Sequence, residues 1–158
     1  MRPATTLDEW TDRYAELRAG RPGSPGAWLG IPLTIIGLIG VLWSLPVASP
    51  LAEASPAINY ATLFLMATFV YYCILSIGLA FGAFLFLLLA SLPSLWLTMA
   101  EVPLAPIAVP VFCAAFIWQL VDTHKATGRL LVILNLQYLM IGPIWLLRAA
   151  YRKLGLDY

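Results

Sequence analysis

The chain has 158 residues, of which 61% are hydrophobic and 11% are charged. Soluble domains are roughly 45–50% apolar and about 25% charged, so a water-soluble fold of this length would expose too much apolar surface. All 9 lysines and arginines lie outside residues 22–124. This distribution excludes a basic face for nucleic acid and predicts an integral membrane protein with a single domain, residues 1–158.

The first segment predicted to be helical, residues 6–19, is amphipathic. Thr6 and Glu9 have the spacing of a capping box, and apolar side chains recur at helical intervals along one face. The apolar residues of this face are Leu7, Trp10, Tyr14 and Leu17. A loop rich in proline and glycine at residues 21–26 ends the helix. We expect the helix to lie in the headgroup layer, and packing on the end of a helical bundle is the alternative.

Four apolar segments follow, and each is predicted to be a membrane-spanning helix. A bilayer core of about 30 Å needs roughly 20 apolar residues in a helix. The four segments are residues 27–47, 57–76, 79–99 and 104–121. A tight turn between the second and third is expected at Ser76 to Gly78. One long helix over residues 57–99 is the competing interpretation, and it would place the two basic ends of the chain on opposite sides of the membrane.

Residues 130–147 are apolar enough to suggest a fifth span. However, Arg129 precedes them and Arg148 follows them, and positively charged loops stay on the cytoplasmic side. The Gly142-Pro143 pair also argues against a continuous helix. We therefore expect a four-helix transmembrane bundle with a C-terminal re-entrant or interfacial helical segment, and both termini on the cytoplasmic side.

Polar side chains near the span ends are the candidate functional residues, because a polar group without a partner is costly in hydrocarbon. Gln119, Asp122 and His124 are expected at the cytoplasmic end of the fourth span. Asp122 or His124 would act as an acid or base, and Gln119 would orient a head group. The expected substrate-pocket residues are Asn59, Asn135 and Gln137. Hydrogen bonding between helices is the alternative role for these side chains.

No metal site and no cofactor are expected from the residues themselves. His124 is the single histidine, whereas an iron or zinc centre usually takes two or three histidines and a carboxylate. Cys73 and Cys113 lie inside apolar runs. We expect them to be small hydrophobic residues of the core, not a disulfide or a pair of metal ligands.

Several motifs occur in the order and spacing of one family of small membrane proteins. They are Thr6-Leu7-Asp8-Glu9-Trp10, Asp12-Arg13-Tyr14-Ala15-Glu16, Gly30-Ile31-Pro32-Leu33, Gln119, Gln137-Tyr138-Leu139 and Ile141-Gly142-Pro143-Ile144-Trp145-Leu146-Leu147. Through them the chain resembles the 2-hydroxy fatty acid dioxygenase family over nearly its whole length. The resemblance implies a membrane-embedded fold and a site that faces lipid. The members of this family are iron(II)-dependent enzymes of fatty acid alpha-oxidation.

The family's metal-binding histidines are mostly missing. Arg18, Ala27 and Thr123 stand at their positions in an ungapped register, although a one-residue gap would bring His124 to the last of them. Alanine and threonine cannot replace an imidazole ligand, and Arg18 would repel a cation. The resemblance therefore favours a diverged relative without iron that binds membrane lipids or a long-chain acyl ligand, with a membrane partner or a homo-oligomer as further associations. The alternatives are an active membrane enzyme on a hydroxy-acyl or other hydrophobic substrate, and an accessory subunit or small transporter.

Overall fold

The computed structural model describes residues 9, 11–12, 14–15, 28–47, 58–127, 132–133 and 139–155. These residues contain five helices and no strand, so the expected all-α fold is confirmed for this part of the chain. The helices are α3 (Gly30–Ser44), α5 (Tyr60–Leu75), α6 (Ile77–Met99), α7 (Ala105–Thr127) and α9 (Ile141–Leu154).

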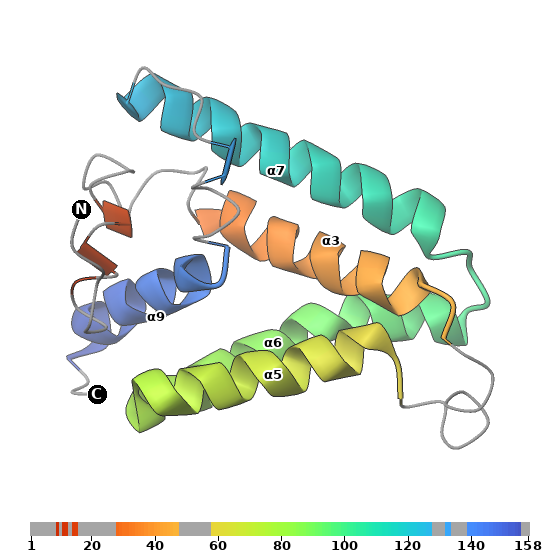
Figure 1. Cartoon of the computed structure of the whole chain (residues 1–158), viewed down its shortest axis with the longest axis horizontal. Helices are drawn as coiled ribbons and strands as arrows, with labels where there is room; N and C mark the ends of the chain where they lie inside the picture. The colour runs from red at the N-terminus through yellow and green to blue at the C-terminus, as the bar shows by residue number, and fades with distance from the viewer. Residues whose placement is uncertain are drawn as a thin grey trace.

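Helix α3 occupies the centre of the bundle (Figure 1). It packs on α7 along one side and on α5 and α6 along the other. Its side chains Ile31, Ile35 and Ile39 are almost fully buried. Helix α9 lies at one end of the bundle, close to the start of α3 (Figure 1). We call this the Gly30 end, and we call the opposite end, where α3 finishes, the Ser44 end.

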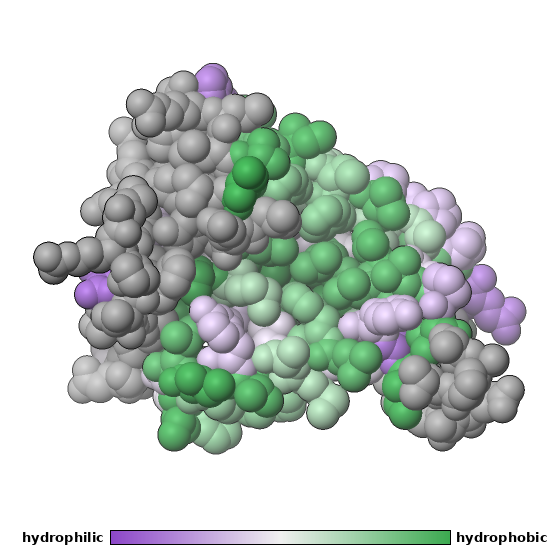
Figure 2. Space-filling model, in the orientation of Figure 1, coloured by the Kyte–Doolittle hydropathy of each residue, from purple (hydrophilic) through white to green (hydrophobic). Residues whose placement is uncertain are grey.

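Two helices are long and apolar enough to cross a membrane, namely α6 over Ile77–Met99 and α7 over Ala105–Lys125. Helices α3 and α5 are apolar but have 15 and 16 residues, fewer than the roughly 20 that span a bilayer core. Of the four predicted spans, two therefore form single helices that are long enough to cross a bilayer. Figure 2 shows apolar residues over the middle of the molecule. Described hydrophobic side chains with at least 67% exposure are Met66, Ile74, Ile77, Phe81, Trp96, Met99 and Ile133.

Ser76 separates α5 from α6 at the predicted turn. Its backbone is extended, with φ −168° and ψ 121°. Its N–H donates to the Tyr72 carbonyl at 2.9 Å, and its Oγ accepts from the Leu79 N–H at 3.5 Å. One residue thus ends the first helix and caps the second. The alternative of a single long helix over residues 57–99 is wrong.

Two helices extend beyond their predicted ends. Helix α7 continues to Thr127, six residues past the predicted end of the fourth span. Helix α9 starts at Ile141 and continues past residue 147 to Leu154. Gly142 and Pro143 lie in its first turn, where proline is tolerated because the first N–H groups of a helix have no partner within it. Residues 130–131 and 134–138 of the predicted re-entrant or interfacial segment, residues 130–147, lie outside the described residues.

The two cysteines do not both lie in the core. Cys73 is half-buried, whereas Cys113 on α7 is exposed, and both are free thiols. The prediction that Cys113 is a core residue is therefore wrong. The reason is that an apolar residue in a helix of this kind can face outward, since the exposed faces of the helices are apolar as well.

Candidate functional site

Helices α3 and α7 approach each other through small residues. A Cβ atom built on Gly37 would lie 2.7 Å from the backbone N and Cα of Phe112. A Cβ on Gly40 would lie 2.7 Å from the Cβ of Ala108. Real Cβ atoms do not approach other atoms so closely, so the two helix backbones are in near contact. This arrangement is typical of helices that associate in membranes.

Gln119 joins the two helices at the Gly30 end of this contact. Its side chain is 5% exposed. Nε2 donates to the Gly30 carbonyl oxygen at 3.0 Å and to Thr34 Oγ1 at 2.5 Å. Thr34 Oγ1 also donates to the Gly30 carbonyl, at 2.7 Å. We call these three residues the Gln119 clasp, in which both hydrogens of the amide are bound by α3.

The clasp belongs to a stripe of buried residues along α7, in which Ala108 meets Gly40 of α3. Its buried members are Ala108, Ala115, Gln119 and Thr123, at the spacing of one helical face. Thr123 Oγ1 donates to the Gln119 carbonyl at 2.9 Å. The geometry of Gln119 therefore agrees with its alternative role, hydrogen bonding between helices.

The structure does not bring Asp122 and His124 to one point. They flank the buried Thr123 in α7, and Asp122 is half-buried while His124 is exposed. Residues two apart in a helix do not face each other. The sequence suggested a shared site because the two residues are neighbours in the chain, but the continuation of α7 through Thr127 points them in different directions.

Asn59 lies at the Ser44 end, at the start of α5 (Figure 1). Its Oδ1 accepts from the Thr62 N–H at 2.9 Å, and its own N–H donates to Thr62 Oγ1 at 3.1 Å. This is a capping box. The 15 residues of α3 separate the two ends, a rise of about 22 Å, so Asn59 and Gln119 do not share a pocket. Asn135 and Gln137 lie outside the described residues.

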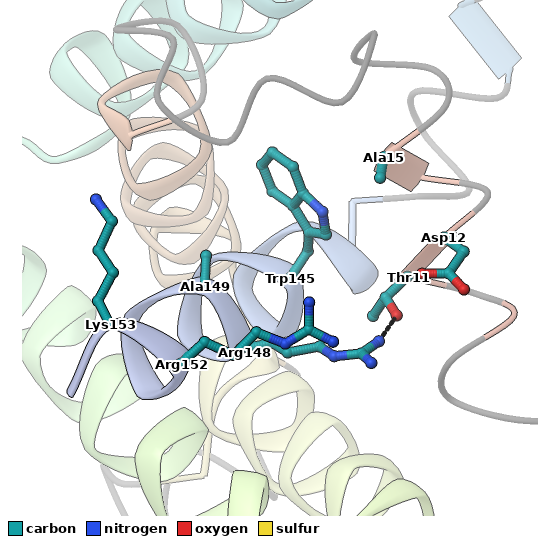
Figure 3. Close-up of a pocket in the computed structure, with 8 residues that line it drawn as sticks. All are labelled: Thr11, Asp12, Ala15, Trp145, Arg148, Ala149, Arg152 and Lys153. Atoms are coloured by element: carbon teal, nitrogen blue, oxygen red, sulfur yellow. Dashed lines mark hydrogen bonds between the residues drawn. The ribbon is translucent and has the colours of Figure 1, made fainter. Parts of the chain in front are cut away.

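A cavity at the Gly30 end was not predicted from the sequence. It has a volume of about 310 Å³ and lies between N-terminal residues and α9 (Figure 3). Its lining residues are Thr11, Asp12, Ala15, Trp145, Arg148, Ala149, Arg152 and Lys153. We call it the α9 cavity. The four-residue spacing of Arg148 and Arg152, directly after an apolar run, is the signal that could have pointed to it.

Buried contacts hold the N-terminal residues against α9. Tyr14 is 3% exposed, and its ring meets the Trp145 ring edge-on, with centroids 5.2 Å apart and planes at 72°. An Arg148 N–H donates to the hydroxyl of Thr11, which is 1% exposed. The described part of the N-terminal segment therefore packs on the end of the bundle, which is the alternative stated above for this segment.

Among the described residues that line the α9 cavity, three are cations and one is a carboxylate. The side chains of Arg148 and Arg152 extend in the same direction along α9 towards Thr11, whereas Lys153 points away from them (Figure 3). Lys153 Nζ lies 5.5 Å from the centre of the Trp28 ring, a cation–π contact. The carboxylate among these described residues is that of Asp12, which is exposed.

Comparison with protein-family models, curated proteins and solved structures finds no match to the chain. Within the described part of the chain, no three His, Cys, Asp or Glu side chains are grouped so that they could hold a metal ion. The helix packing, the Gln119 clasp and the α9 cavity are therefore the features from which a function can be argued.

Proposed function

We propose that the chain is a multi-pass integral membrane protein that binds lipid, with α3, α5, α6 and α7 crossing the bilayer. The observation that carries this proposal is the large hydrophobic side chains exposed along these helices, among them Met66, Phe81 and Trp96. Each would face water in a soluble monomer, at a cost of about 25 cal/mol for every Å². In a bilayer the same surface contacts acyl chains.

The two shorter helices can be accommodated in such a bundle. Residues 28–47 form a described stretch of 20 residues around α3 without a charged side chain, which is long enough for a span. Helix α5 begins directly after Ile58 and Asn59. A short span is accommodated by local thinning of the bilayer at a modest cost in free energy.

The distribution of charge supports an orientation. Lys125, Arg148, Arg152 and Lys153 belong to the end of α7 and to α9, and both lie at the Gly30 end (Figure 1). Glu101 lies in the connection between α6 and α7, at the other end. Since basic segments remain in the cytoplasm, we place the Gly30 end and both termini on the cytoplasmic side.

As a chain that resembles the 2-hydroxy fatty acid dioxygenases, this protein would bind lipid without iron chemistry. Thr123 stands at one of the family's histidine positions. Its hydroxyl donates to the Gln119 carbonyl and its side chain is 2% exposed. His124 is exposed on another side of α7. These residues do not fit an iron centre, because a threonine cannot replace an imidazole ligand.

Fractionation and native mass spectrometry test the proposal. The protein is expected to remain in membranes through an alkaline carbonate wash. After extraction in mild detergent it is expected to carry bound lipid and no stoichiometric iron. A protein that is monodisperse in buffer without detergent would contradict the membrane assignment. One equivalent of bound iron would contradict the iron-free function.

A further inference from the structure

We infer that the α9 cavity binds the phosphate group of an anionic phospholipid. The inference rests on the proposed function, because a lipid headgroup reaches this cavity only if the Gly30 end lies at a membrane surface. The cavity is large enough for a phosphate, at about 310 Å³, and its wall includes the apolar side chains of Ala15, Trp145 and Ala149.

The charges that line the cavity favour an anion. Among the described lining residues, Arg148, Arg152 and Lys153 are cations and Asp12 is a carboxylate. Arg148 and Arg152 lie four residues apart, which places them on the same face of α9, where like charges repel each other. An anion held between the two guanidinium groups would interact favourably with both.

The geometry also favours phosphate. A guanidinium group donates two parallel hydrogen bonds to phosphate oxygens. Arg148 is positioned by its hydrogen bond to the buried hydroxyl of Thr11, and Arg152 extends beside it (Figure 3). Two adjacent guanidinium groups directed into one concavity form a fork that a lipid phosphate can enter from the membrane surface.

The position of α9 supports a lipid as the source of the phosphate. Residues 141–146 of α9 are buried, whereas Arg152 and Lys153 near its C-terminal end are exposed. The cytoplasmic leaflet carries the anionic phospholipids, and basic pockets on that side bind their headgroups. Dissolved inorganic phosphate has the same chemistry, so the experiment must separate the two sources.

Competition between lipids in mixed micelles tests the inference. The full chain is equilibrated with equal amounts of phosphatidylglycerol and phosphatidylcholine, and native mass spectrometry measures which lipid it retains. Wild-type protein is expected to prefer phosphatidylglycerol. Arg152→Gln is expected to weaken that preference about fivefold. One basic residue near an anionic surface contributes about 1 kcal/mol of binding free energy, which corresponds to a factor of about five.

Lys125→Gln is the matched control, because Lys125 is an exposed cation at the same end of the bundle that does not line the cavity. It is expected to leave the preference unchanged. Equal losses in both variants, or no loss in either, would overturn the inference. If Arg152→Gln does not fold, Lys153→Gln takes its place as the cavity variant. It is also expected to weaken the preference for phosphatidylglycerol.

Inorganic phosphate distinguishes the two sources of the anion. Millimolar phosphate is expected to leave bound phosphatidylglycerol in place. If phosphate alone stabilises the protein against heat and displaces the lipid, a soluble anion occupies the cavity and the lipid assignment is wrong. A protein that leaves the membrane during the carbonate wash would contradict the proposed function instead, so the two failures are distinguishable.

Discussion

The Gln119 clasp should stabilise the contact between α3 and α7, and Gln119→Met removes it with little change in side-chain volume. The amide makes two hydrogen bonds to α3, at 3.0 Å and 2.5 Å. Hydrogen bonds between helices in membranes contribute about 0.6 kcal/mol on average and up to about 1.7 kcal/mol. We therefore expect the variant to lower the free energy of unfolding by about 1–2 kcal/mol.

A double-mutant cycle separates the clasp from general packing. Thr34→Val removes the acceptor of one Gln119 bond and keeps the side-chain shape. If the two side chains interact as described, their losses in the free energy of unfolding are not additive. The loss in the double variant should be smaller than the sum of the two single losses, by at least about 0.6 kcal/mol. The assay is equilibrium unfolding in mixed micelles of mild detergent and denaturing detergent, followed by circular dichroism.

Thr98→Val is the matched control for the threonine substitution. The Thr98 hydroxyl donates to the Ser94 carbonyl at 2.8 Å within α6, and the residue is exposed. Its removal should change the free energy of unfolding by less than about 0.5 kcal/mol. A coupling energy of zero between positions 119 and 34, or an equal loss in the control, would refute the clasp.

Three further substitutions test other contacts. Ala115→Leu should lower the free energy of unfolding by about 1–3 kcal/mol, because the larger side chain overfills the interface of α7 with α3. Ala114→Leu on the exposed face of α7 should change it by less than about 0.5 kcal/mol. Equal effects of the two substitutions would contradict the packing. Asn59→Ala should cost about 1 kcal/mol through loss of the α5 cap, and Asn59→Asp should retain most of it. Tyr72→Phe removes the 2.8 Å bond to the Met140 carbonyl, so hydrogen exchange should accelerate at the start of α9; unchanged exchange there would show that the bond does not hold α9.

The helical class and the turn at Ser76 could be predicted from the sequence. Long apolar runs without basic residues identify membrane helices because each residue that faces lipid must be apolar. Ser76 interrupts such a run with a side chain that caps the next helix. Both features depend on local sequence, and local sequence is what pattern analysis reads.

The end of α7 could not be predicted in the same way. Hydropathy falls at Asp122, and the predicted span ended at residue 121, but helical hydrogen bonds continue to Thr127. Gln119 and Thr123 on α7 are buried despite their polarity. Gln119 is hydrogen-bonded to Gly30 and Thr34 of α3, about 90 positions earlier in the chain, and hydropathy does not detect such partners.

The roles of Asn59 and the α9 cavity depended on distant contacts. The polarity of Asn59 predicts a pocket residue, whereas in the structure Asn59 caps α5 at the Ser44 end. The cavity forms only when Thr11 and Tyr14 pack on α9. The sequence predicted a basic flank after residue 147 but could not show that the N-terminal residues close a cavity over it.

Cysteine labelling of the two ends of the bundle tests the central claim most directly. In a Cys73→Ala, Cys113→Ala background, Lys125→Cys, Lys153→Cys and Glu101→Cys are each treated with an impermeant thiol reagent, in intact cells and in inverted vesicles. The account predicts that positions 125 and 153 react only in inverted vesicles and that position 101 reacts only in intact cells. Labelling of all three from one side, or of 125 and 153 from opposite sides, would contradict it.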